Sequence, residues 1–295
     1  MKVSFLGLGA IGRPMAVHLA KLHELTVWNR TEERARAFGA KHQARVASTP
    51  RDAASGAEVV LTCLPTSQDV ERLLEGDAGL EAGLERGALF IDCTSGDAAT
   101  SRRIAARLAP KQIAFVDAPV SGGTNGAEAG ALTVMVGGDR AAFDRAVPIL
   151  QAFGKRIVLL GPLGSGDAMK AVNNTLLGVN ILALAEGLTA LVKAGVNPKL
   201  AVETLNASSG RSFVSEGLIP DRVLTGAWPV TFRLALLDKD VGICMGLLDE
   251  LGLPGPLLHR AAELLHEARA ALGEQADYLA PIRREEQRSG VEIRG

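Results

Sequence analysis

The chain has few cysteines and few histidines, and neither residue type is spaced for a metal site. Cys63, Cys93 and Cys244 lie far apart and form no Cys-x-x-Cys pair, which argues against a disulfide scaffold or a zinc site. The five histidines form no His-Glu-x-x-His pattern. We therefore expect no bound metal, and three buried free thiols in a reducing compartment.

A surplus of one charge is also missing. The chain has 32 Lys and Arg residues against 33 Asp and Glu residues, and without a basic block a nucleic-acid partner is not expected. The first residues run into a strand pattern without the features of a secretory signal. The apolar run Leu176–Val192 contains Asn180 and Glu186, so it reads as a buried helix rather than a membrane span of about 20 apolar residues. A cytoplasmic enzyme without a membrane partner fits these absences.

Short apolar runs alternate with helical patterns over about the first 160 of the 295 residues. The predicted strands are Val3–Leu6, Leu25–Trp28, Val59–Thr62, Ala88–Asp92, Ile113–Asp117, Leu132–Val136 and Arg156–Leu159. The predicted helices between them include Gly12–Leu22, Glu32–Phe38, Ser67–Leu74 and Asp97–Leu108. This alternation predicts βαβ crossovers and a Rossmann-like, doubly wound α/β domain with a mainly parallel sheet.

After the Gly/Pro-rich stretch 161–166 the strand patterns stop and helical patterns follow. We therefore predict a Rossmann-like domain at 1–162 and a smaller all-helical domain at 163–295. The second domain would begin with one long central helix reaching about Ala194. A helix of that length needs burial on several sides, which favours a homodimer or homotetramer. The charged tail from Arg283 is expected to be mobile.

A glycine-rich turn follows the first predicted strand. Gly7-Leu8-Gly9-Ala10-Ile11-Gly12 matches Gly-x-Gly-x-x-Gly and opens a helix, the context that the dinucleotide-binding motif requires. The first glycine permits the tight turn, the second lets a pyrophosphate approach the backbone, and the third allows close helix packing. The alternative is a tight turn without a ligand.

The second predicted strand ends without a carboxylate. NAD-preferring folds place Asp or Glu here to bind the ribose 2′-hydroxyl, whereas this chain has Asn29, Arg30 and Thr31. A guanidinium with neutral neighbours suits a 2′-phosphate, so NADP is predicted as the cofactor, with NAD as the second choice. Alternatively, Arg30 merely caps the strand or pairs with Glu33.

The long predicted helix carries polar groups near its start. Lys170, Asn173 and Asn174 interrupt an otherwise apolar run, and residues three and four apart share a helix face. Burial lowers the pKa of a lysine toward the range useful for acid–base catalysis. The candidate role of Lys170 is general acid and base, and the alternative is an exposed lysine on the first turn of a core helix.

Several segments together resemble the β-hydroxyacid dehydrogenase family, which includes 3-hydroxyisobutyrate dehydrogenase and semialdehyde reductases. The resemblance spans essentially the whole chain. The segments that carry it are Phe5–Met15, Cys63-Leu64-Pro65, Ile91–Ser95, Asp117–Gly123, Gly166–Asn174 and Leu237–Asp240. Ile11 and the Cys93-Thr94 pair depart from the residues that are frequent in the family.

The resemblance implies roles for individual residues. Lys170 resembles the catalytic lysine, and Asn174 resembles the amide that holds the substrate. The implied carboxylate-binding loop is Ser121, Gly122 and Gly123. The implied cofactor contacts include Leu64, Pro65 and Ser95, and Lys239 with Asp240 resembles the family's late Lys-Asp pair near the cofactor. Phe232 is expected to cover the substrate pocket. We interpret Asp69 and Asp240 as helix-start residues, and Trp28 and Trp228 as packing residues.

The predicted function is hydride transfer between NADP(H) and a small 3-hydroxy acid or semialdehyde. Four alternatives stay open: an imine reductase, a 6-phosphogluconate dehydrogenase, a non-catalytic NADP-binding interaction module, and a structural dimer without cofactor. Lys170, Asn174 and the Ser-Gly-Gly loop argue against the interaction module, and a fluorescence titration with NADPH would separate the structural dimer from the rest. The identity of the substrate does not follow from the sequence.

Overall fold

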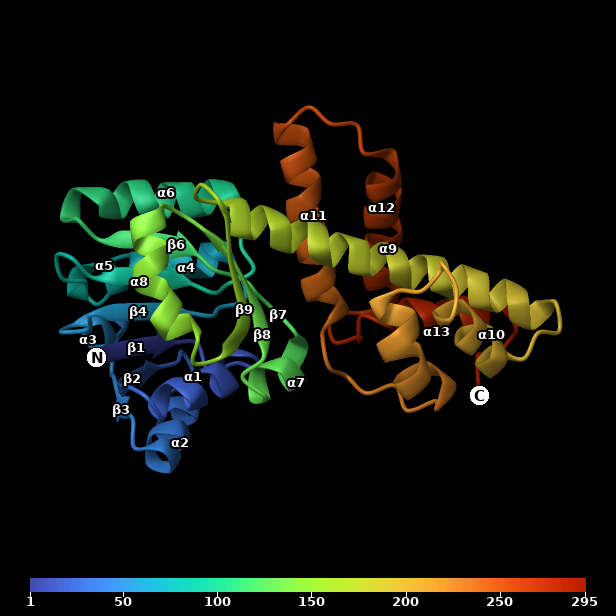
Figure 1. Cartoon of the computed structure of the whole chain (residues 1–295), viewed down its shortest axis with the longest axis horizontal. Helices are drawn as coiled ribbons and strands as arrows, with labels where there is room; N and C mark the ends of the chain where they lie inside the picture. Colours follow the sequence, from blue (N-terminus) through green and yellow to red (C-terminus); the bar gives the residue numbers. More distant parts are fainter. The chain divides into compact units, whose positions relative to one another are not determined.

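The computed structural model describes residues 1–295, which form two compact units, Met1–Lys170 and Ala171–Gly295. Each unit is coloured along the chain in Figure 1. The sequence placed the boundary between residues 162 and 163, whereas the two units divide within helix α9 (Ser165–Lys193). The first turns of α9 belong to the first unit because their backbone hydrogen-bonds to the end of a strand there.

The first unit is built on one nine-stranded sheet. Its strands are β1 (Lys2–Leu6), β2 (Glu24–Trp28), β3 (Arg45–Val46), β4 (Val59–Thr62), β5 (Leu89–Asp92), β6 (Ala114–Asp117), β7 (Val120–Ser121), β8 (Leu132–Gly137) and β9 (Gly154–Gly161). The order is β3-β2-β1-β4-β5-β6-β8-β7, with β9 paired to β8. Strands β1 to β6 are parallel, and β8 runs antiparallel to β6 and β7. The predicted Rossmann-like, mainly parallel sheet is confirmed.

Helices cover both faces of this sheet. They are α1 (Gly12–Ala20), α2 (Glu32–His42), α3 (Pro50–Ala54), α4 (Ser67–Leu74), α5 (Leu80–Gly83), α6 (Ala98–Leu108), the 3-10 helix η1 (Ala109–Lys111), α7 (Gly123–Glu128) and α8 (Arg140–Leu150). Buried residues of α1, α2, α7 and α8 share one hydrophobic cluster, and those of α3 to α6 share another.

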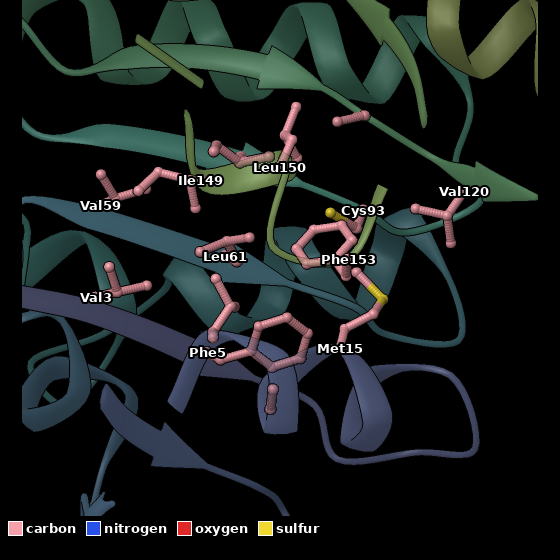
Figure 2. Packing of buried hydrophobic residues seen from close by; sticks show 14 of the residues in the cluster. Val3, Phe5, Met15, Val59, Leu61, Cys93, Val120, Ile149, Leu150 and Phe153 are labelled. Atoms are coloured by element: carbon pink, nitrogen blue, oxygen red, sulfur yellow. The ribbon is translucent and has the colours of Figure 1, made fainter. Parts of the chain in front are cut away.

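Side chains of the central strands alternate between these two clusters, as the period of two in a β-strand requires. Leu89 and Ile91 of β5 enter the first cluster, and Phe90 between them enters the second. Figure 2 shows the side chains of Phe5, Met15 and Phe153 together in the first cluster. Burial on both faces explains why the central strands read as continuous apolar runs.

The second unit is all helical, as predicted. After α9 it contains α10 (Pro198–Asn206), a π-helix η2 (Val214–Leu224), α11 (Leu234–Glu250), α12 (Pro256–Leu272) and α13 (Ala280–Ser289). Its core contains Ile181 and Leu188 of α9 together with Leu237, Leu265 and Ile282. By length and composition α9 could cross a membrane, but a core helix of a soluble protein passes the same test. Its Ile181 and Leu188 lie in the core of this unit.

The expectation of a mobile tail from Arg283 is wrong. Residues 280–289 form α13, and Ile293 beyond it is fully buried. The Glu286 carboxylate accepts from the Ile293 backbone N–H at 2.7 Å and from Arg294 Nη1 at 2.7 Å. A partly buried ion pair and the buried Ile293 side chain thus hold this charged segment.

Candidate active site

The glycine-rich turn after β1 has three glycines with three different surroundings. Gly7 has φ +109°, and a Cβ there would lie 2.3 Å from the carbonyl oxygen of Cys63. A Cβ on Gly12 would lie 2.0 Å from the carbonyl oxygen of Gly7. A Cβ on Gly9 would meet no protein atom within 4 Å. The fold therefore requires the first and third glycines, whereas the second leaves an open approach to the main chain.

The end of β2 is tied to this turn by one amide side chain. Asn29 Oδ1 accepts from the Leu8 backbone N–H at 2.9 Å, and Asn29 Nδ2 donates to the Thr31 carbonyl at 2.9 Å. Arg30, between them, is exposed. Burial raises the pKa of Asp69, but hydrogen bonds from Thr66 and Arg72 lower it overall, and the charge of Arg30 adds a smaller lowering effect. Asp69 lies in the first turn of α4, and the Thr66 side chain caps this helix by accepting from the Asp69 N–H. The interpretation of Asp69 as a helix-start residue is confirmed.

The loops after β4 and β5, which contain the expected cofactor residues Leu64, Pro65 and Ser95, are joined by polar contacts. The Leu64 backbone N–H donates to Thr94 Oγ1 at 3.0 Å, and the Thr94 N–H donates to Asp92 Oδ1 at 3.0 Å. Thr62 Oγ1 donates to the same Asp92 oxygen at 2.7 Å. Burial raises the pKa of Asp92 to about 6, against these hydrogen bonds, which lower it.

The predicted carboxylate-binding loop lies between β7 and α7. Ser121 is the last residue of β7, Gly122 has φ +135°, and Gly123 starts α7 with φ +63°. A Cβ on Gly123 would meet no atom within 4 Å, so its main-chain groups are open to an approaching ligand. His18 of α1 places Nε2 3.1 Å from the Ala127 carbonyl oxygen, which ties α7 to the helix that follows the glycine-rich turn.

Lys170 lies in the second turn of α9 and is 9% exposed. The exposed lysine considered as an alternative is therefore not what the structure shows. Asn174 follows Lys170 by four residues on the same helix, which places the two side chains on one face. The structure thus presents a buried amine and a buried amide on one face of α9.

In the second unit, Asn174 belongs to a chain of polar side chains. Asn174 Nδ2 donates to Asp240 Oδ2 at 2.5 Å, and Asn173 Nδ2 donates to Asn174 Oδ1 at 3.1 Å. Lys239 Nζ lies 2.8 Å from Asp240 Oδ1. The interpretation of Asp240 as a helix-start residue is wrong: α11 begins at Leu234, and Asp240 is a buried carboxylate that joins an amide and an ammonium group.

Phe232 lies just before α11 and is half-buried. Its backbone N–H donates to Asp277 Oδ2 at 3.2 Å, and its carbonyl accepts from the Tyr278 N–H at 2.9 Å. Its ring packs edge-on against Tyr278, with ring centroids 5.5 Å apart. These contacts fix the position of Phe232, and its role over a substrate stays a prediction.

Comparison with known proteins places these features in a family. Residues 2–161 match the family described as the NAD binding domain of 6-phosphogluconate dehydrogenase, and residues 164–284 match that described as the NAD-binding of NADP-dependent 3-hydroxyisobutyrate dehydrogenase. The 2-(hydroxymethyl)glutarate dehydrogenase of Eubacterium barkeri is 36% identical over 100% of this chain and 98% of its own. The 3-hydroxyisobutyrate dehydrogenase of Pseudomonas aeruginosa is 34% identical over 90% of this chain and 94% of its own.

The chain belongs to the β-hydroxyacid dehydrogenase family. The fold agrees, since the Mycobacterium tuberculosis 3-hydroxyisobutyrate dehydrogenase structure with L-serine superposes with a TM-score of 0.87 at 29% identity, covering 96% of this chain and 98% of that one. The protein is therefore an NAD(P)-dependent hydroxyacid dehydrogenase, a conclusion that its relatives' names and both family matches support.

The glycine-rich turn of this dehydrogenase fits a nicotinamide dinucleotide. Only the second glycine, Gly9, lacks a protein neighbour that would explain the missing side chain. The approach of a pyrophosphate to the backbone supplies that explanation. The turn also places the start of α1 where its dipole favours an anion.

Several buried carboxylates were not among the predicted site residues, and Asp117 and Asp240 are two of them. Asp240 follows Lys239 in one of the segments that resemble the family, and this position in the chain is what could have identified it as a site residue. Asp117 opens the segment that contains the Ser-Gly-Gly loop, but its partners lie 47 and 50 residues further along the chain, and no sequence spacing indicates them.

Proposed function

We propose that the protein transfers a hydride reversibly between NADP(H) and a small 3-hydroxy acid or its semialdehyde, with Lys170 as general acid and base. The nicotinamide, when bound, supplies or accepts the hydride at the carbinol carbon. In reduction, Lys170 Nζ gives a proton to the carbonyl oxygen as that oxygen becomes a hydroxyl. In oxidation, neutral Lys170 takes the proton back, and such a positioned group contributes about 10²–10⁴-fold.

The single observation that supports this role most directly is the burial of Lys170, 9% exposed, one turn before the buried amide of Asn174. Buried ionisable groups on an otherwise apolar helix are candidates for catalysis. Asn174 is itself held by Asp240, so its amide has a fixed orientation. A fixed orientation matters because misplacement by about 1 Å can cost about 10²-fold in rate.

The proposed substrates carry a carboxylate for the Ser121-Gly122-Gly123 loop. The names of the relatives share one chemical pattern, since 3-hydroxyisobutyrate, 2-(hydroxymethyl)glutarate and L-serine are all 3-hydroxypropanoates that differ at carbon 2. Consecutive glycines with positive φ bring main-chain N–H groups toward an anion. We infer that the loop binds this shared carboxylate and that the carbon-2 substituent selects the substrate.

NADP is proposed as the preferred cofactor because the three residues directly after β2, Asn29, Arg30 and Thr31, include no carboxylate. Both ends of the Asn29 amide are engaged within the protein, so the exposed guanidinium of Arg30 is the charged group offered at this position. A guanidinium forms strong charge-assisted hydrogen bonds with a phosphate.

The deciding experiment measures initial rates of NADPH oxidation, with NADH in parallel, on glyoxylate, succinic semialdehyde, tartronate semialdehyde and methylmalonate semialdehyde. We expect turnover of tartronate semialdehyde or methylmalonate semialdehyde, which are both 3-oxopropanoates, with a preference for NADPH. Turnover of glyoxylate or succinic semialdehyde alone would contradict the proposed 3-hydroxy acid class. Lys170→Ala should abolish turnover while NADPH still binds in a fluorescence titration. Retained turnover in this variant would exclude Lys170 as the acid and base.

The cofactor proposal is tested by Arg30→Ala. Loss of a hydrogen bond to a charged group costs about 1.5–3 kcal/mol, so the KM for NADPH should rise about 10–100-fold while the KM for NADH stays within about twofold. The control is Arg36→Ala, which removes an exposed guanidinium that pairs with Glu32 at 2.6 Å. Equal changes for both cofactors would show that Arg30 does not contact a 2′-phosphate.

A further inference from the structure

The helix that carries Lys170 has no capping side chain of its own. The residue before α9 is Gly164, so the usual side-chain acceptor for the first backbone N–H groups is absent. Asp117, the last residue of β6, takes that place. Its Oδ1 accepts from the Gly164 N–H at 2.7 Å, and its Oδ2 accepts from the Asp167 N–H at 2.9 Å. The Gly166 N–H is a further donor to this carboxylate.

Two glycines make this approach possible. A Cβ on Gly137, at the end of β8, would lie 2.4 Å from Asp117 Oδ1 and 2.8 Å from the Ser165 backbone nitrogen. A Cβ on Gly166 would lie 2.2 Å from the Met135 carbonyl oxygen and 2.7 Å from Asp117 Oδ2. The first turn of α9 therefore lies directly against the ends of β6 and β8.

A second buried carboxyl group, Asp167, stands beside Asp117 without capping the helix. Ser101 Oγ donates to Asp167 Oδ2 at 2.6 Å. Burial raises the pKa of Asp167 well above its ordinary value, and the neighbouring Asp117 carboxylate raises it further. Burial raises the pKa of Asp117 as well, but backbone N–H groups at the start of α9 donate to its carboxylate and lower the pKa. Asp117 therefore has the donors that favour an ionised carboxylate at the helix N-terminus.

The distance from this cap to Lys170 is short. Lys170 follows Asp167 by three residues, a rise of about 4.5 Å along an α-helix, and no flexible residue lies between them in α9. Any shift or rotation of the capped turn is therefore passed to Lys170 through a rigid segment of backbone.

We propose that Asp117 is a positioning residue for Lys170: its carboxylate fixes the first turn of α9 and thereby the location of the acid and base. This inference rests on the proposed role of Lys170. Asp117 itself acts through the main chain of residues 164–167 and takes no part in proton transfer.

The test compares Asp117→Asn, Asp167→Asn and Lys170→Ala with the unaltered protein in NADPH-dependent aldehyde reduction. Asparagine at 117 keeps one acceptor and turns an NH₂ group toward a backbone N–H, which loosens the cap. We expect its kcat to fall about 10–100-fold with the KM for NADPH within about twofold, since the glycine-rich turn is unchanged. Asp167→Asn is the matched buried control, and its kcat should stay within about threefold.

Thermal unfolding of each variant separates positioning from general stability. Asp117→Asn is expected to unfold at a lower temperature because it weakens the cap, whereas Asp167→Asn should unfold at or above the temperature of the unaltered protein because it removes a carboxyl group whose ionisation burial and Asp117 oppose. Rates are measured well below both unfolding temperatures, so a loss of kcat confined to Asp117→Asn is not caused by unfolding. The positioning role is overturned if Asp117→Asn keeps kcat within twofold, or if both Asn variants lose kcat equally. Retained turnover in Lys170→Ala would instead contradict the proposed role of the lysine, so the two failures are distinguishable.

Discussion

Two buried carboxylates, Asp117 in the first unit and Asp240 in the second, hold different parts of helix α9. Asp117 accepts from main-chain N–H groups at the helix start, whereas Asp240 accepts from the side chain of Asn174 and pairs with Lys239. Main-chain donors are present whatever the side chains are, so the first carboxylate fixes where the helix lies. The second fixes only how one side chain points, and it depends on two further residues.

Gly166→Ala is expected to have the largest effect, because it disturbs the main-chain contacts between Asp117 and the start of α9. The added methyl would meet the Met135 carbonyl oxygen at 2.2 Å and Asp117 Oδ2 at 2.7 Å. Because a backbone group cannot easily move aside, we expect the free energy of unfolding to fall by about 3 kcal/mol, measured by urea titration. Gly187→Ala in the same helix is the control, because a Cβ at Gly187 would meet no neighbouring atom within 4 Å. It should raise the free energy of unfolding by up to about 1 kcal/mol. Similar losses in both variants would contradict the role of the docked turn.

Asp240→Asn tests the side-chain contacts of Asp240 with Asn174 and Lys239. The asparagine removes the charge that lies 2.8 Å from the Lys239 ammonium and sets an amide against the Asn174 amide. The free energy of unfolding should therefore fall by about 1–3 kcal/mol. With Asn174 reoriented, the KM for the aldehyde should rise in steady-state assays. The control is Asp249→Asn, an exposed position on the same helix α11, expected within about 0.5 kcal/mol. An unchanged KM would separate Asp240 from substrate binding.

A smaller effect concerns the pH dependence of stability. It arises from Asp92, a third buried carboxyl group, whose pKa the charge of Asp117 helps to raise. Burial raises the pKa of Asp92 from 3.8 to about 6, so the folded protein holds this proton more tightly than the unfolded chain does. Between about pH 4 and pH 6, rising pH therefore lowers the free energy of unfolding, by at most about 1.4 kcal/mol per pH unit from this group.

Asp92→Asn should remove that contribution and flatten the decrease. Urea titrations from pH 4.5 to pH 7 would measure the difference between the variant and the unaltered protein. Asp77→Asn at an exposed position serves as the control. Parallel curves for Asp92→Asn and the unaltered protein would show that Asp92 is ionised throughout this range.

The sheet of the first unit was readable from the sequence because its central strands are buried on both faces. Val59–Thr62 was predicted with the observed bounds, and the other predicted strands differ only at their ends. The antiparallel direction of β8 and the short strands β3 and β7 were not predicted, since pairing direction has no local pattern. The π-helix η2 contains Pro220, which reads as a break, and the order of residues 280–295 depends on the tertiary burial of Ile293.

The candidate site was readable only where its residues are close in the chain. Lys170 and Asn174 are one turn apart, and the glycine-rich turn is continuous, so spacing alone indicated both. Asp117 and its helix partners are separated by more than forty residues, and Asp240 meets Asn174 66 residues away. These contacts are made by the fold, and no local pattern predicts them.

The amide of Asn29 has a consequence for any redesign of cofactor preference. An aspartate at this position would still accept from the Leu8 N–H, but its second oxygen would face the Thr31 carbonyl, to which Asn29 now donates. Installing the acidic residue typical of NAD enzymes here would therefore strain the turn that is meant to bind the new cofactor. Arg30, exposed and outside this pair of hydrogen bonds, is the position at which charge can be changed while the turn keeps its shape.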